Sequence, residues 1–208
     1  MVLANLRRAE HDLNKPERLA SCGRPTPWVH LALLDPDGKE VPRGEPGEIC
    51  VRGPLVMKGY KDMPEQTAEA FAGDWLHTGD VGKLDAEGFL YIVDRTKDMI
   101  VTGGFNVFPR EVEDVLAGHE AIGQVAVVGV PDEQWGEAVR AVIVLRPGFE
   151  PGPDLVQALQ ALVKQAKGSV QAPKSIDFVD AIPLTPVGKP DKKTLRARYW
   201  QGHERGVG

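Results

Sequence analysis

The chain has little cysteine, no excess of positive charge and no long hydrophobic run. Its two cysteines, Cys22 and Cys50, form no CxxC pair and have no histidine cluster nearby, so the sequence predicts no metal site and no disulfide framework. The net charge of −5 argues against a nucleic-acid partner, because a phosphate backbone requires a basic protein surface. No stretch approaches the roughly 20 apolar residues of a transmembrane helix. These absences favour a soluble protein of a reducing compartment such as the cytoplasm.

Several standard catalytic signatures are also missing. The sequence contains no GxSxG elbow, no HExxH, no GxGxxG after a strand and no GxxxxGK[ST] loop. Hydrolase and nucleotide-loop interpretations therefore lose most of their support. Glycine and proline are abundant, at 23 and 17 of 208 residues, which favours short strands and turns over a helical bundle.

Charge and patterning both divide the chain near residue 94. Residues 1–94 contain 11 Lys or Arg against 16 Asp or Glu, net −5, whereas residues 95–208 contain 14 of each, net 0. The first part shows mainly strand and turn signals, and the second mixes strands with helices. The sequence therefore predicts an α+β protein, with a small mostly-β subdomain over residues 1–94 and an α+β domain over residues 95–208.

Apolar periodicity and turn residues predict the elements of both parts. Strands are expected at 29–34, 48–52, 89–93, 99–101, 125–130, 138–145 and 176–179, and helices at 64–72, 109–118, 154–168 and 191–199. The strands at 125–130 and 138–145 are continuous apolar runs, which is typical of buried strands. The basic residues Lys192, Lys193, Arg196 and Arg198 are expected to form one exposed helical face.

Four polar clusters could carry chemistry, and two of them lie near the boundary. Residues 75–80 end in Thr78-Gly79-Asp80, where a carboxylate could accept two hydrogen bonds from a vicinal diol such as that of a ribose. On this triplet alone, an ordinary surface-turn aspartate is the better interpretation. Residues 94–98 include Asp94 and Arg95 and fit either a solvated hairpin tip, which is favoured in isolation, or an interdomain hinge.

The other two clusters lie in the second part. Gly103 and Gly104 permit positive φ and close approach of the backbone to a thin ligand. A plain turn between a strand and a helix would need only one glycine, so a functional and a structural role are equally favoured. Residues 183–190 place Lys189 on a loop rich in proline and glycine, which suits a phosphate or carboxylate partner; a solvated loop lysine is the alternative.

The order of the clusters is more specific than any one of them, and it resembles the adenylate-forming (AMP-binding) family of acyl-CoA synthetases, nonribosomal adenylation domains and luciferases. The resemblance extends over about residues 20–198. The motifs that carry it are GEICVRG at 47–53, WLHTGD at 75–80, GFLY at 88–91, DRTKD at 94–98, GGFNVFP at 103–109, EVE at 111–113 and LTPVGK at 184–189.

The resemblance implies an activity and a role for each matching residue. Family members convert a carboxylic acid and ATP into an acyl-adenylate and pyrophosphate, and then transfer the acyl group to a thiol such as that of coenzyme A, releasing AMP. By this resemblance Lys189 is catalytic, nucleotide is bound by Asp80, Arg95 and Thr78, Asp94 is the hinge of a mobile lid formed by residues 95–208, and the CoA channel is bordered by Gly103, Gly104 and Phe105. The implied cofactors are ATP and Mg²⁺, with CoA as co-substrate.

Part of the family pattern has no counterpart in this sequence. The phosphate loop, the Tyr-Gly-x-Thr-Glu segment and the walls of the acid pocket are not matched before residue 20, and most Mg²⁺ ligands would lie in those segments. We therefore expect the C-terminal part of an acyl-CoA synthetase, inactive alone. Residues 105–113 favour fatty-acid–CoA or aryl-acid–CoA ligases over domains that load a carrier protein.

Two alternatives to an acyl-CoA synthetase stay open, and a second copy of the chain is a possible partner. The chain could be a non-catalytic module that binds a nucleotide or another protein, or an adenylation domain that loads a carrier protein. A homodimer could form through a truncated surface at which Val29, Leu31 and Leu33 lack partners.

Overall fold

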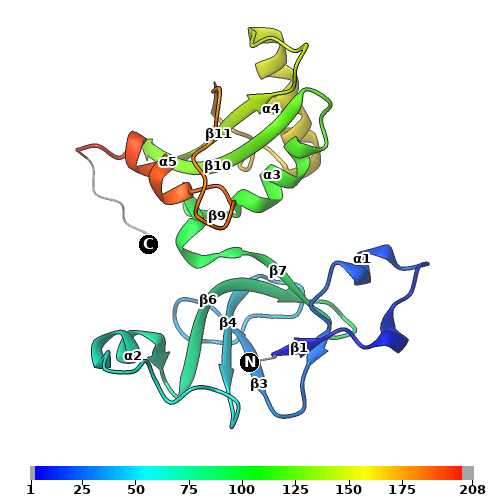
Figure 1. Cartoon of the computed structure of the whole chain (residues 1–208), viewed down its shortest axis with the longest axis vertical. Coiled ribbons are helices and arrows are strands. Elements are labelled where there is room, and N and C mark those ends of the chain that lie inside the picture. Colours follow the sequence, from blue (N-terminus) through cyan, green and yellow to red (C-terminus); the bar gives the residue numbers. More distant parts are fainter. Residues whose placement is uncertain (1–2, 203–208) are drawn as a thin grey trace. The chain divides into compact units, whose positions relative to one another are not determined.

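The computed structural model describes residues 3–202, and contacts within the chain divide it into two compact units, Met1–Thr96 and Lys97–Gly208 (Figure 1). The division falls two residues after the predicted boundary at residue 94. That the units correspond to a subdomain of a larger domain and to a lid stays a prediction. No helix in the described part of the chain has the length and apolar character needed to cross a membrane.

The first unit is built on a five-stranded antiparallel sheet. Its strands are β3 (His30–Leu34), β4 (Gly47–Arg52), β5 (Phe71–Ala72), β6 (Trp75–Leu84) and β7 (Leu90–Arg95). Strand β4 lies between β3 and β6, and both β5 and β7 pair with β6. The unit also contains β1 (Ala4–Asn5) paired with β2 (Arg24–Pro25), a 3₁₀ turn at Arg8–Glu10, α1 (Pro16–Leu19) and α2 (Pro64–Ala70).

The segment that precedes β3 covers the core of this sheet, which corrects the expectation of an exposed apolar surface. Val29 and Leu33 are only 7% and 3% exposed, and Leu31 packs against the same cluster. Leu3 and Cys22 belong to that cluster, so the first 25 residues supply the partners that were expected to be missing. A homodimer stays a prediction, but the burial of Val29 and Leu33 removes the exposed apolar surface on which that prediction was based.

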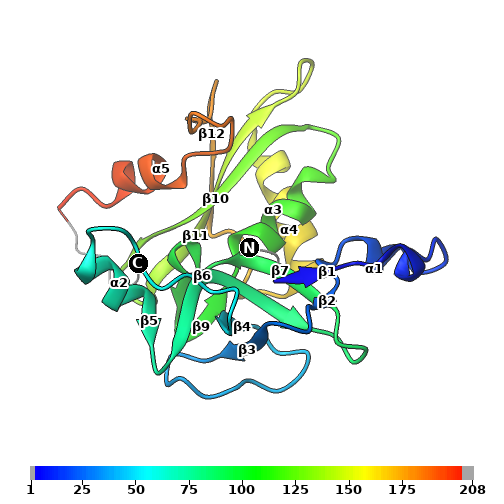
Figure 2. The same cartoon turned by 60° about the horizontal axis from the view of Figure 1, so that its bottom comes forward.

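The second unit is a sheet with helices on both faces. Its elements are β8 (Ile100–Thr102), β9 (Phe105–Val107), α3 (Pro109–Ala117), β10 (Ile122–Asp132), β11 (Gly136–Leu145), α4 (Pro153–Lys167), β12 (Ser175–Phe178) and α5 (Lys192–Tyr199). The sheet order is β10-β11-β8-β9, and β12 joins β11 in parallel. Helices α3 and α4 lie side by side against one face, and α5 lies on the other side of β10 and β11 (Figure 2).

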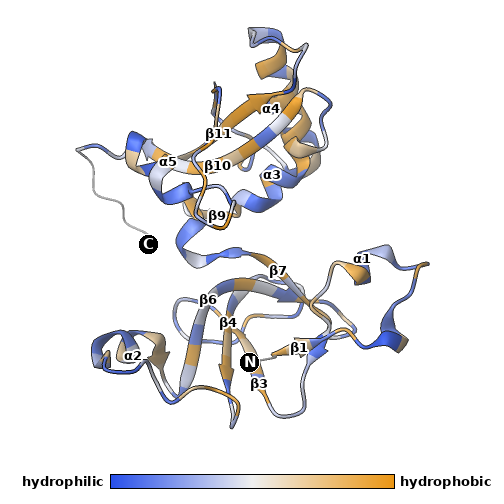
Figure 3. Ribbon diagram, in the orientation of Figure 1, coloured by the Kyte–Doolittle hydropathy of each residue, from blue (hydrophilic) through white to orange (hydrophobic). Residues whose placement is uncertain are grey.

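Alternation along the two central strands explains their continuous apolar sequences. Val127 and Ile143 face the cluster of α3 and α4, whereas Val128 and Val142 face the cluster that contains Leu195 of α5. Because both faces are covered, neighbouring residues of a strand are all buried. Strand β11 is accordingly coloured mostly as hydrophobic in Figure 3.

Most predicted helices and strands are confirmed, with one informative difference at residues 94–98. Asp191 caps α5, since its carboxylate accepts the Thr194 N–H at 3.0 Å. The hairpin-tip interpretation of residues 94–98 is wrong, because Asp94 and Arg95 complete β7 and residues 96–98 form a 3₁₀ turn. The register pairs Val81 with Asp94 across the sheet, so residue 94 lies within the ladder.

The core of the second unit gives a stability prediction. Leu116 of α3 has no exposed surface, and we expect Leu116→Ala to lower the free energy of opening of this unit by about 2–5 kcal/mol, because a cavity replaces buried methyl groups. Hydrogen exchange of β10 amides measures that opening without interference from the first unit. Leu184→Ala, at a side chain that is 53% exposed, is the control. Equal losses in the two variants would contradict the assignment of this core.

Candidate functional site

A bulge in β6 presents the Thr78-Gly79-Asp80 segment. Glu48 of β4 pairs with Val81 of β6, and Cys50 pairs with His77. The two pairs are therefore two residues apart on β4 and four residues apart on β6. The extra residues bend away from the ladder, as in β-bulges generally. Gly79 lies at φ +72°, a conformation that favours glycine. The predicted turn is therefore an interruption within one long strand.

Hydrogen bonds from β4 fix the shape of this bulge. The Glu48 carboxylate accepts the Gly79 N–H through Oε1 at 3.0 Å, and its Oε2 lies 2.7 Å from His77 Nδ1. The Thr78 hydroxyl donates to the Ile49 carbonyl at 2.7 Å and accepts the Asp80 N–H at 3.2 Å. The Thr78 side chain is thus used within the fold, and the backbone before Asp80 is held on both sides.

Asp80 and Arg95 form an accessible pair of opposite charges. They are opposed in the β6–β7 register, and Arg95 Nε lies 3.4 Å from Asp80 Oδ1. Their side chains are 37% and 57% exposed, so the ion pair itself contributes only about 0–1 kcal/mol. A weak, exposed pair can open toward a ligand at low cost. The carboxylate could then accept hydroxyl hydrogen bonds while the guanidinium faces an anion.

Asp94 differs from these neighbours because it is buried. It is 8% exposed, and its Oδ1 accepts the N–H of Arg95 at 2.8 Å. It therefore helps to set the backbone that presents Arg95, two residues before the boundary between the units. Its predicted role as a hinge is not tested by this geometry.

The two glycines at 103 and 104 have a structural reason that the sequence did not reveal. Thr102 pairs with Phe105, which makes Gly103-Gly104 the two-residue turn of the β8–β9 hairpin. Their φ values of +57° and +82° match the turn type that needs positive φ at both positions. The expectation that one glycine suffices is thus wrong, since β9 was not foreseen. Phe105 is 61% exposed beside this turn.

Lys189 lies on a loop with its own internal hydrogen bonds. The Thr185 N–H donates to the Lys189 carbonyl at 2.7 Å, and the Lys189 N–H donates to Thr185 Oγ1 at 3.2 Å. Gly188, at φ +78°, allows the tight turn between them. Lys189 is exposed, and over residues 3–202 its ammonium group has no ion-pair partner. The loop also lines, together with α3 and β10, a pocket of about 440 Å³.

The basic residues that follow Lys189 are not one exposed face. Lys192 Nζ lies 2.8 Å from Glu113 and Arg196 Nη1 lies 2.6 Å from Asp98, with side chains only 14% and 13% exposed. These pairs fasten α5 to other elements of its unit. Of Lys189, Lys192 and Arg196, only Lys189 is exposed.

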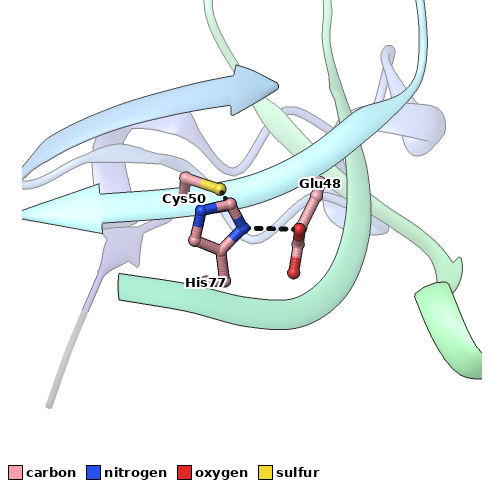
Figure 4. A group of neighbouring side chains, drawn as sticks. All are labelled: Glu48, Cys50 and His77. Carbon is pink, nitrogen blue, oxygen red and sulfur yellow. Dashed lines mark hydrogen bonds and ion pairs between the residues drawn. The ribbon is translucent and has the colours of Figure 1, made fainter. Parts of the chain in front are cut away.

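The predicted site residues fall into two groups, one in each unit. Thr78, Asp80, Asp94 and Arg95 lie together at the bulge of the first unit, whereas Gly103, Gly104, Phe105 and Lys189 belong to the second. Sequence reasoning missed Glu48 and His77, which come together with Cys50 (Figure 4). The carboxylate and the imidazole are 29 residues apart in the chain, and only the pairing of β4 with β6 brings them into contact.

Comparison with known proteins identifies the family. The model described as AMP-binding enzyme matches residues 2–61, and the model described as AMP-binding enzyme C-terminal domain matches residues 111–189. The chain belongs to the AMP-binding enzyme family. It aligns over its full length, at 58% identity, with 37% of the medium/long-chain-fatty-acid–CoA ligase FadD8 of Mycobacterium tuberculosis. It thus spans little more than a third of that relative and is homologous to the C-terminal part of fatty-acid–CoA ligases.

Two solved structures share this fold. The amide bond synthetase McbA of Marinactinospora thermotolerans superposes with a TM-score of 0.81 and 42% identity, over 95% of this chain and 39% of that one. The ATP-bound MatB of Rhodopseudomonas palustris gives a TM-score of 0.78 and 37% identity, over 89% of this chain and 37% of that one. The α+β fold and the family resemblance are confirmed.

The environment of Cys50 predicts its reactivity. Burial, aided by the negative charge of Glu48, raises the pKa of this thiol from 9.0 to about 12, which lowers its thiolate fraction at about pH 8 roughly a thousandfold. We expect a thiol reagent, added with a chelator, to label partly exposed Cys22 and to leave Cys50 unmodified in the native chain. Denaturation should expose both. Rapid labelling of two thiols before unfolding would contradict the buried position of Cys50.

Proposed function

We propose that the chain acts in the ATP-dependent conversion of a fatty acid to its CoA thioester, as the C-terminal part of an acyl-CoA synthetase. The exposed pair formed by Asp80 on the bulge and Arg95 on β7 carries this proposal, since it offers a carboxylate that could accept hydrogen bonds from a diol beside a cation that could face an anion. The 58% identity with a medium/long-chain-fatty-acid–CoA ligase supports the fatty acid as substrate class. Coenzyme A is the proposed co-substrate. Two free cysteines favour the predicted cytoplasmic setting.

In the first half-reaction, a carboxylate oxygen of the acid attacks the α-phosphorus of ATP and pyrophosphate leaves. Asp80 would accept hydrogen bonds from the ribose hydroxyls, with Thr78 holding the backbone that carries it. Arg95 and Lys189 would offset negative charge, Lys189 at the α-phosphate and the substrate carboxylate. Mg²⁺ would accompany the ATP phosphates, and we assign it no ligand among these residues.

In the second half-reaction, the thiol of coenzyme A attacks the acyl carbonyl carbon and AMP leaves. The Gly103-Gly104 turn lacks side chains, so it could border the narrow pantetheine arm, with exposed Phe105 beside it. Residues of the second unit serve both half-reactions, which requires that unit to move. We propose Asp94, next to the boundary, as the pivot.

The chain by itself provides the first test. Incubated with ATP, coenzyme A and a fatty acid, it should release no pyrophosphate above a no-enzyme control, because its sequence has no counterpart of the family's phosphate loop. The full-length M. tuberculosis relative is the positive control. Turnover by the chain alone would overturn the assignment of the missing steps to other segments.

A chimera tests the role of Lys189. The upstream part of the M. tuberculosis ligase, joined to this chain, should form acyl-CoA, and Lys189→Ala should slow adenylation about 100- to 1,000-fold by removing charge at the α-phosphate. Thioester formation from supplied acyl-adenylate should persist. Lys193→Ala, an exposed lysine on α5, is the matched control. Equal loss of both half-reactions would show that Lys189 is structural.

A further inference from the structure

Three potential metal ligands converge between β4 and β6. The carboxylate of Glu48, the sulfur of Cys50 and a ring nitrogen of His77 all lie within 4.8 Å of one another (Figure 4). Cys50 is fully buried, whereas the side chains of His77 and Glu48 are 26% and 23% exposed. The sulfur of Cys50 is therefore shielded from solvent, whereas the side chains of His77 and Glu48 are accessible to it.

The hydrogen bonds of this trio compete for one atom. His77 Nδ1 lies 2.7 Å from Glu48 Oε2 and 3.4 Å from Cys50 Sγ. In any one protonation state this nitrogen either donates to the carboxylate or accepts from the thiol, but it cannot do both. A cation at the centre would accept a lone pair from each of the three groups at once.

We propose that Glu48, Cys50 and His77 bind a thiophilic divalent cation of the Zn²⁺ class. Carboxylate, imidazole and thiolate are the donors that proteins use for Zn²⁺. Tetrahedral bonds of about 2.3 Å to sulfur and about 2.0 Å to nitrogen place those two atoms about 3.5 Å apart, close to the 3.4 Å between Sγ and Nδ1. Tetrahedral bonds of about 2.0 Å to oxygen and to nitrogen place those two atoms about 3.3 Å apart, so Glu48 Oε2, which lies 2.7 Å from Nδ1, would move outward by about half an ångström.

The surroundings suit such a site. Glu48 Oε1 accepts the Gly79 N–H, which orients the carboxylate while Oε2 stays directed at His77. Because His77 and Glu48 are partly exposed, water could supply a fourth ligand. Binding would release the thiol proton of Cys50 to solvent. This inference does not rest on the proposed function, because no nucleotide or acid takes part.

Cobalt provides a direct test in the full chain under reducing conditions. Titration with Co²⁺ should produce one equivalent of a near-ultraviolet thiolate-to-cobalt absorption band, which Zn²⁺ then removes. Cys50→Ala should abolish the band, whereas Cys22→Ala, at the other free cysteine, should retain it. Absence of the band in the unsubstituted chain, or its survival in Cys50→Ala, would overturn the proposal and leave a hydrogen-bonded trio only.

A second set of variants guards against misfolding of the buried cysteine variant. His77→Gln changes a partly exposed side chain and should weaken Zn²⁺ binding at least tenfold, as measured by competition with a chromophoric chelator. His30→Gln, at an exposed histidine of β3, is the matched control and should bind as the unsubstituted chain does. Circular dichroism establishes that each variant is folded. Unchanged affinity in a folded His77→Gln chain would rule out the site.

Discussion

The geometry of the candidate site in the first unit depends on the two contacts that the Glu48 carboxylate makes with β6. Between the two register pairs on either side of the bulge, β6 has two more residues than β4. The ladder between the strands does not hold the backbone of these extra residues in place. One oxygen of Glu48 accepts the Gly79 N–H and the other approaches His77, so a single side chain sets both the start and the middle of the bulge. These contacts thereby help to fix the position of Asp80, which follows Gly79 in the bulge.

The sequence predicted those features that depend on local pattern. The apolar runs at 125–130 and 138–145 and the helices expected at 109–118 and 191–199 rest on local signals, and the structure agrees with them. Features set by strand pairing were out of reach. The contact of Glu48 with His77 and the burial of Arg196 against Asp98 join segments that are 29 and 98 residues apart, which only the fold brings together. The second glycine of the β8–β9 turn is local, and its role was missed because strand β9 was not expected.

The division of the chain into two units has a mechanical meaning. Each unit has its own hydrophobic core, one around Val51 and Leu90 and the other around Val127 and Ile143. The groups presented by each unit can therefore keep their internal geometry without support from the other. The two proposed half-reactions would need such independence, because each unit would have to keep its shape while the position of the other changes.

The loop of Lys189 carries a consequence for binding entropy. Its backbone is already closed by the two hydrogen bonds between Thr185 and Lys189, and prolines at 183, 186 and 190 limit the conformations of the same segment even before the chain folds. Capture of an anion would then restrict little more than the side-chain rotamers of one lysine, worth up to about 2 kcal/mol, rather than the torsions of a whole loop. A bound anion would therefore restrict the long Lys189 side chain, whereas the backbone of the loop would lose little conformational entropy.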